Sequence, residues 1–270
     1  MCGIVGVVAR RGRFTRAQVE AAVDAVRARG PDACGLERFD LPNGRELWLG
    51  HARLSILDLS DGGAQPMVRR KVTAHPAATH PVRGAIVFNG EVYDHASHRE
   101  GLPGLRTRSD TEVLLEGVLA HGAPFVARLD AMLAAAVYDA RAGTLVLARD
   151  RLGKKPLFLY EDEGVLAFAS QPGAFAALGV PLAVDPLARA YVRWLGYVPG
   201  PHCIWARCRT FPAASVATVD LAGDLRVCPE GYWDPLGGYA ANYAGTEADA
   251  RTESSIRDVS SARASASVPA

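Results

Sequence analysis

The chain opens with Met1-Cys2-Gly3-Ile4-Val5-Gly6-Val7-Val8, in which a cysteine is followed at once by a short apolar run. Such a run so close to the terminus predicts a strand that holds the end of the chain inside a sheet. Removal of Met1 would leave Cys2 with both a thiol and a free α-amine, and a neutral amine can accept the thiol proton near physiological pH. Cys2 is therefore a candidate nucleophile. The alternative is a small buried hydrophobe, which is the usual role of a cysteine.

The composition of the 270 residues is that of a globular protein, with 49% hydrophobic and 22% charged residues. The net charge is +1 without a long basic run, so we expect no nucleic-acid partner. No apolar stretch has the length of a membrane span, and the N-terminus does not resemble a signal peptide. Five cysteines at irregular spacing favour reduced thiols in a cytoplasmic protein. Cys203 and Cys208 lack a second pair at zinc spacing, so we interpret them as structural and expect no metal site.

Apolar periodicity predicts more strands than helices. Capping boxes at Thr15/Gln18 and Ser109/Glu112 predict two helices, the first ending near 29–31. Short connections between the strands favour antiparallel sheets with helices packed outside. The predicted strands are 47–49 and 54–57 around Gly50-His51, 85–93, 132–138, 144–148 and 165–169.

The dipeptide Asn89-Gly90 lies between strand-forming residues, and taken alone it is a strong signal for a hairpin turn. After Tyr232-Trp233 the composition changes to Ala, Ser, Gly, Thr and charged residues. Such a segment buries too little apolar surface to offset the entropy of ordering, so 237–270 is predicted to be a linker or disordered tail.

Six short motifs occur in order along the chain. They are Cys2-Gly3-Ile4-Val5-Gly6, Arg29-Gly30-Pro31-Asp32, Gly50-His51-Ala52-Arg53-Leu54-Ser55-Ile56, Phe88-Asn89-Gly90-Glu91-Val92-Tyr93, Ser109-Asp110-Thr111-Glu112 and Arg149-Asp150-Arg151-Leu152-Gly153-Lys154-Lys155-Pro156-Leu157. Together they resemble the class II glutamine amidotransferase domain, an N-terminal-nucleophile hydrolase, in the form found in glutamine-hydrolysing asparagine synthetases.

The resemblance implies an α+β fold, a four-layer αββα sandwich of two antiparallel sheets. It also implies three regions: an amidotransferase domain at 2–180, a connector resembling the start of a synthetase region at 181–236, and the tail at 237–270. The Ser-Gly-Gly-x-Asp-Ser loop that marks the ATP-pyrophosphatase domain of these synthetases does not occur in this sequence. We therefore expect no cofactor for the reaction of this chain, with ATP and Mg required only by a synthetase domain.

The resemblance also assigns roles to individual residues. Cys2 would attack the side-chain amide of glutamine, and the Asn89 side chain and Gly90 N–H would form the oxyanion hole. Arg53 would bind the α-carboxylate, and Glu91 and Asp110 would accept hydrogen bonds from the α-ammonium. The full substrate-binding set is Arg53, Leu54, Ile56, Asn89, Gly90, Glu91 and Asp110.

Other polar residues of the motifs are expected to have structural roles. We expect His51 to order its loop. Arg29, Asp32, Arg149 and Asp150 are expected to form structural ion pairs.

The function that the resemblance implies is hydrolysis of glutamine to glutamate and ammonia in the cytoplasm, as the glutaminase half of an asparagine synthetase. A synthetase domain or subunit would accept the ammonia, and a homodimer is possible. Two alternatives remain open at this point. The chain could be a glutaminase subunit that supplies another ATP-dependent amidation or peptide-modifying enzyme, or a glutamine-binding protein without activity if Met1 is retained.

Overall fold

Alternating side chains in strand β1 (Gly3–Arg10) separate two hydrophobic cores. Ile4 and Val8 belong to the cluster between the two sheets, whereas Val5 and Val7 pack in a second cluster that includes helix α1 (Arg16–Asp24). Successive residues of a strand point to opposite faces, so the apolar run that ends at Ala9 buries both faces of β1. This is the reason that the strand begins one residue after Cys2 and does not fray.

The computed structural model describes residues 1–55, 61–70, 81–102 and 104–235. Its strands form two six-stranded antiparallel sheets, β10-β8-β9-β1-β3-β2 and β12-β11-β7-β6-β5-β4. The first sheet contains, besides β1, the strands β2 (Ala33–Asp40), β3 (Arg45–Arg53), β8 (Phe158–Asp162), β9 (Val165–Ala169) and β10 (Cys208–Thr210). The second contains β4 (Met67–Arg70), β5 (Val82–Val92), β6 (Ala131–Asp139), β7 (Thr144–Arg149), β11 (Ser215–Asp220) and β12 (Glu230–Gly231).

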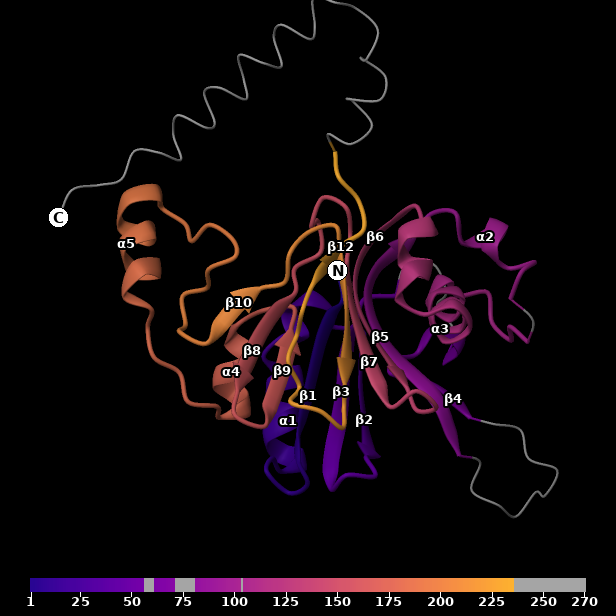
Figure 1. Cartoon of the computed structure of the whole chain (residues 1–270), viewed down its shortest axis with the longest axis horizontal. Coiled ribbons are helices and arrows are strands. Elements are labelled where there is room, and N and C mark those ends of the chain that lie inside the picture. Colours follow the sequence, from indigo (N-terminus) through magenta and orange to yellow (C-terminus); the bar gives the residue numbers. More distant parts are fainter. Residues whose placement is uncertain (56–60, 71–80, 103, 236–270) are drawn as a thin grey trace, which may run out of the picture. The chain divides into compact units, whose positions relative to one another are not determined.

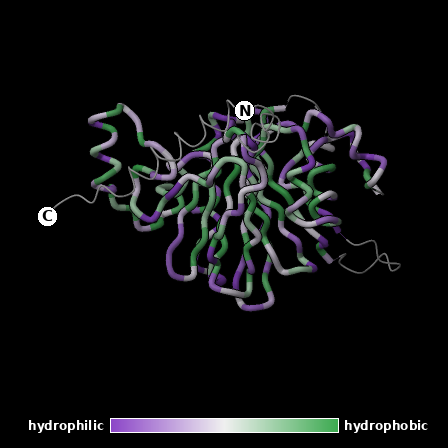
Figure 2. Tube along the Cα trace, turned by 45° about the horizontal axis from the view of Figure 1, so that its top comes forward, coloured by the Kyte–Doolittle hydropathy of each residue, from purple (hydrophilic) through white to green (hydrophobic). Residues whose placement is uncertain are grey.

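Helices cover the outer face of each sheet, which confirms the predicted α+β sandwich of two antiparallel sheets (Figure 1). Helix α1 and α4 (Gly173–Leu178) pack on the first sheet, and α3 (Asp110–His121) packs on the second. Figure 2 shows hydrophobic residues concentrated along the strands and hydrophilic residues at many of the turns. The remaining helices are α2 (His95–His98), α5 (Pro186–Leu195), η1 (Arg27–Arg29), η2 (Asp61–Gly63) and η3 (Ala123–Arg128).

The first capping box is present as predicted, because the Thr15 side chain accepts from the Gln18 N–H and the Gln18 side chain accepts from the Thr15 N–H. The second is wrong in part. Ser109 caps α3 by accepting from Thr111 N–H at 3.2 Å, but the Glu112 carboxylate binds the backbone at 106–107 instead of Ser109. A buried carboxylate needs several donors, and the preceding loop supplies more of them than one cap position does.

One strand prediction is wrong, and one alternative that the sequence left open is excluded. Gly50-His51 does not separate two strands, because β3 runs through it from Arg45 to Arg53. Asn89-Gly90 is not a hairpin turn, because β5 continues through it to Val92 with regular pairing to β6. In both cases neighbouring strands supply pairing on the sheet, which overrides the local turn preference of glycine.

The segment predicted as a connector, 181–236, contributes strands to both sheets: β10 pairs with β8, and β11 pairs with β7. Residues Met1–Tyr232 form one compact unit. The predicted tail at 237–270 lies outside the described residues. In the described part of the chain, no helix combines the length and the apolar character that crossing a membrane requires.

Candidate active site

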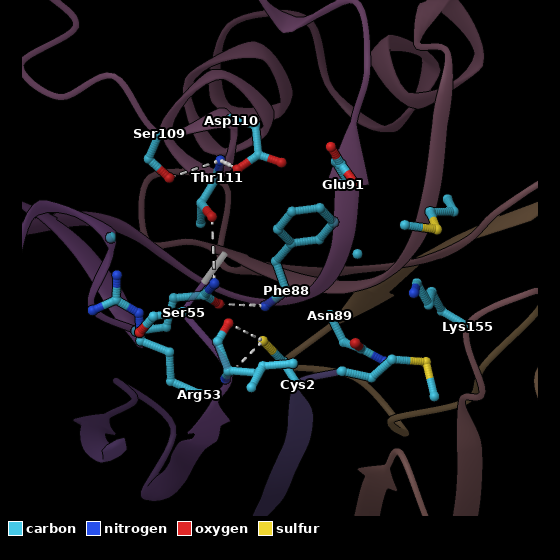
Figure 3. A pocket seen from close by; sticks show the side chains of 16 residues that line it. Cys2, Arg53, Ser55, Phe88, Asn89, Glu91, Ser109, Asp110, Thr111 and Lys155 are labelled. Atoms are coloured by element: carbon cyan, nitrogen blue, oxygen red, sulfur yellow. Dashed lines mark hydrogen bonds between the residues drawn. The ribbon is translucent and has the colours of Figure 1, made fainter. Parts of the chain in front are cut away.

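A pocket opens at the end of the sandwich where β1 begins and β3 ends (Figure 3). Inner-face positions of β1 and β3 bring several of its side chains together. In β3 the inward series Leu47 and Leu49 continues to His51 and Arg53, and Cys2 continues the inward series of β1. The lining residues are Met1, Cys2, Arg53, Leu54, Ser55, Gly63, Gln65, Phe88, Asn89, Gly90, Glu91, Ser109, Asp110, Thr111, Met132 and Lys155.

The thiol of Cys2 is held against the backbone of Leu54. The Leu54 N–H donates to Cys2 Sγ at 3.4 Å, and Sγ lies 3.6 Å from the Leu54 carbonyl oxygen. Arg29 Nε donates to the Cys2 carbonyl oxygen at 2.9 Å, and burial lowers the pKa of this guanidinium while the Cys2 charge raises it. These contacts fix both the backbone and the sulfur of Cys2, a requirement for a nucleophile that must approach a bound carbon atom in a defined direction.

Asn89 presents an unpaired hydrogen-bond donor. Its side chain is almost fully buried, and Nδ2 is one of five buried side-chain nitrogens without a hydrogen-bond partner among the described residues. A buried amide donor without a partner costs about 1–3 kcal/mol. In a folded protein such an unpaired donor marks a place where a ligand acceptor is expected.

The N–H of Gly90 also faces away from the neighbouring strand. Along β5 the N–H groups of Phe88 and Val92 bond to the Gln65 side chain and to Asp110, on the side opposite β6. Gly90 lies between them with the same parity, so its N–H points to this side as well. A side chain at position 90 would place its Cβ 2.0 Å from the Met132 carbonyl oxygen, so glycine is required here.

Two side chains fix the peptide groups of Phe88, which lies past the first pair of β4 and β5, Met67 and Ile86. Gln65 Oε1 accepts from the Phe88 N–H at 2.6 Å, and His51 Nε2 lies 3.2 Å from the Phe88 carbonyl oxygen. Since a carbonyl only accepts, Nε2 carries the proton. Burial lowers the pKa of His51 to about 4, the Phe88 contact raises it and nearby Arg53 lowers it further. The sequence predicted that His51 orders its own loop. This is wrong, because His51 holds a strand of the other sheet.

Asp110 is positioned by the first turn of α3. Its carboxylate accepts from Val92 N–H at 3.0 Å and from Thr111 N–H at 2.8 Å. Glu112, fully buried two residues later, accepts from the N–H groups of Arg106 and Thr107, both at 2.7 Å, and pairs with Arg69. The Glu112 network thus secures the loop that leads into the helix.

The structure brings most of the predicted site residues into the same pocket. Cys2, Arg53, Leu54, Asn89, Gly90, Glu91 and Asp110 all line it. Ile56 lies outside the described residues.

The four residues expected to form ion pairs are structural in a different way. Within the described residues none of them takes part in an ion pair whose atoms lie within 4 Å, and each bonds backbone groups instead. Arg29 binds the Cys2 carbonyl and Asp32 accepts from Ser55 N–H at 2.8 Å. Arg149 donates to three carbonyl oxygens, and Asp150 accepts from N–H groups that include Leu133 and Lys155. In each case the charged side chain satisfies backbone N–H or carbonyl groups.

Several pocket residues were not assigned from the sequence. Gln65 carries no periodic or motif signal, since its role depends on where β4 begins. Lys155 lies in the motif from Arg149 to Leu157, but the sequence assigned no role to this residue. In the described ranges no three His, Cys, Asp or Glu side chains cluster to hold a metal ion.

A family model described as the glutamine amidotransferase domain matches residues 1–233. The chain therefore belongs to this family, as its motifs predicted. It is 29% identical over 251 residues to a putative glutamine-hydrolysing asparagine synthetase 2 of Methanocaldococcus jannaschii, covering 90% of this chain and 48% of that protein. It is 32% identical over 195 residues to amidase chyE of Penicillium rubens, covering 67% of this chain and 27% of that protein.

The chain spans about half or less of the length of these curated relatives. Among solved structures, it is similar to a glutamine phosphoribosylpyrophosphate amidotransferase from B. subtilis. The TM-score is 0.60 at 15% sequence identity, and the match covers 86% of this chain and 49% of that one. At this identity the similarity concerns the fold, and it agrees with the predicted N-terminal-nucleophile hydrolase architecture.

Proposed function

We propose that this chain hydrolyses the side-chain amide of glutamine through a thioester on Cys2. The observation that carries the proposal is the meeting of three groups at one pocket: a fixed thiol, the unpaired Asn89 amide and the outward Gly90 N–H. A nucleophile next to two oriented donors is the arrangement that acyl transfer needs.

The reaction would proceed in two balanced halves. Cys2 Sγ attacks the amide carbon, and its proton passes through the α-amine to the leaving nitrogen, which departs as ammonia when the C–N bond breaks. Water then attacks the thioester, the C–S bond breaks, and glutamate and the thiol are formed. Asn89 and Gly90 would donate to the oxygen as it becomes negative in each half. The α-amine is available only after Met1 has been removed.

Charged residues around the thiol would orient the substrate. Arg53 suits the α-carboxylate because a guanidinium donates two parallel hydrogen bonds to it. Glu91 and Asp110 line the same pocket and would accept from the α-ammonium. Glutamine would therefore enter as a zwitterion with its amide at Cys2.

The acceptor of the ammonia is the finer part of the proposal. Similarity to glutamine-hydrolysing asparagine synthetases favours a synthetase domain or subunit as partner, and asparagine as the final product. The alternative is a glutaminase that supplies another amidation. The chain is also similar to proteins named amidases, so the similarities are not confined to asparagine synthetases.

Glutamate release provides the test. The chain without Met1 is incubated with glutamine alone and, separately, with glutamine, aspartate, ATP and magnesium, and glutamate and asparagine are measured. We expect glutamate at the same rate in both mixtures, no asparagine, and no glutamate from Cys2→Ala. Activity retained by Cys2→Ala would overturn the mechanism. Asparagine formed together with AMP would overturn the proposal that a separate synthetase domain or subunit uses the ammonia.

A further inference from the structure

Lys155 places a cation in the active-site pocket. The residue is only 6% exposed, yet it lines the pocket together with Asn89 and Glu91. Among the described residues its ammonium has no hydrogen-bond or ion-pair partner, although two carboxylates, Glu91 and Asp110, line the same pocket. The side chain is therefore largely buried, but its Nζ is not among the buried side-chain nitrogens of the described residues that lack a partner, so the ammonium reaches the pocket, where an anion that enters can pair with it.

The backbone of Lys155 is fixed on both sides. Its N–H donates to Asp150 Oδ2 at 3.0 Å, and its carbonyl accepts from Arg149 Nε at 2.8 Å. The neighbouring Lys154 also bonds Asp150 through its N–H at 2.8 Å, but it is exposed. The two lysines therefore share one anchor, and only the second is directed into the pocket.

Figure 3 shows Arg53 toward one end of the pocket and Lys155 toward the other, with Cys2 and Asn89 between them. In the proposed binding mode, Arg53, Glu91 and Asp110 neutralise the two charges of the substrate backbone. Lys155 then lies on the side of the reacting amide. A lysine ammonium has three donors and no acceptor, so it cannot accept a hydrogen bond from the NH₂ group of glutamine. It can bind the oxygen that replaces this NH₂ group on hydrolysis.

We infer that Lys155 forms an anion subsite for the γ-carboxylate that hydrolysis creates on glutamate. This inference rests on the proposed glutamine hydrolysis. The subsite distinguishes product from substrate by charge: the ammonium adds no affinity for the neutral amide, but it attracts the carboxylate. It makes glutamate a product inhibitor whose affinity depends on Lys155, whereas the affinity for glutamine does not.

The test measures binding without turnover. Full-length protein lacking Met1 and carrying Cys2→Ala is titrated calorimetrically with L-glutamine and with L-glutamate. The same titrations are made after adding Lys155→Met, Lys155→Gln, Lys155→Arg or the matched control Lys154→Met, and thermal melts identify the folded variants. We expect Lys155→Met and Lys155→Gln to weaken glutamate binding about tenfold and to change glutamine binding less than about twofold.

The arginine variant keeps a positive charge and is expected to retain glutamate affinity within about threefold. Lys154→Met is expected to change neither affinity. Equal weakening of both ligands by Lys155→Met and Lys155→Gln, or no weakening of glutamate, would overturn the subsite. If protein that retains Cys2 still hydrolyses glutamine in that case, the proposed function stands without the subsite. If Cys2-containing protein does not hydrolyse glutamine and the Cys2→Ala protein does not bind it, both proposals are overturned.

Discussion

His51 Nε2 in β3 lies 3.2 Å from the carbonyl oxygen of Phe88 in β5, so one imidazole joins the two sheets at the residue before Asn89. The ring is 1% exposed, and its Nδ1 has no partner among the described residues. Both features mean that the ring remains neutral at neutral pH, because a protonated ring would bury an unpaired charge. The orientation of Asn89 thus depends on a residue of the opposite sheet.

Replacing His51 tests this dependence. His51→Leu keeps much of the volume but removes the bond, and we expect kcat for glutamine hydrolysis to fall about tenfold with KM nearly unchanged. His51→Gln can still donate a hydrogen bond and is expected to restore part of the loss. An increase in KM without a change in kcat would contradict a role in positioning the oxyanion donor.

The low pKa of His51 also predicts a pH dependence of stability. The pKa is about 4 in the folded protein and about 6.5 when unfolded, so the unfolded chain binds the proton first. Stability from this group is complete above pH 6.5 and is lost as the pH falls toward 4, by about 3 kcal/mol at most. Urea unfolding at pH 4.5 and 7 should show a smaller difference for His51→Gln than for the wild type. An equal difference in both proteins would exclude His51 as the source.

Removal of Asn89 should affect catalysis and not folding. Asn89→Ala deletes a buried donor that has no partner in the described part of the chain, so we expect kcat to fall about 10²–10³-fold with little change in KM or melting temperature. Asn43 provides a matched control, since its amide donates to the Leu221 carbonyl at 2.7 Å. Asn43→Ala should lower the melting temperature and leave kcat per folded molecule unchanged. The reverse pattern would make Asn89 a structural residue.

Retention of Met1 should abolish turnover. A peptide bond to Met1 converts the proposed base into an amide nitrogen, which cannot accept the thiol proton. Intact mass spectrometry separates the two forms, and glutamate production is measured for each. Equal rates from both forms would require a different base.

Glu112 should stabilise the loop before α3. The carboxylate is fully buried, and although burial alone raises its pKa, hydrogen bonds from Arg106, Thr107 and Arg69 lower it. Glu112→Gln leaves the guanidinium of Arg69 with a weaker partner, and we expect a loss of about 3 kcal/mol in urea unfolding. Glu20→Gln, at an exposed pair with Arg16, should cost less than about 1 kcal/mol. Similar losses in the two variants would contradict the proposed importance of burial.

Local patterns in the sequence determined much of the fold and of the site. The apolar alternation of β1, the capping box at Thr15 and the strand Val165–Ala169 depend on neighbouring residues only, so the sequence predicted them correctly. The motifs likewise predicted the family and seven of the residues that line the pocket, because each of these residue types suits a defined chemical task.

Contacts between distant segments decided the rest. Whether Asn89-Gly90 turns or continues a strand depends on β6, which supplies the pairing partners from more than 40 residues away. Gln65 enters the site only because β4 begins at Met67, opposite Ile86, and leaves the peptide group of Phe88 to be satisfied. Lys155 faces the pocket because Asp150 and Arg149 fix its backbone. The physical reason is common to these cases: a buried polar group must find a partner, and only the packed chain determines which partner is near.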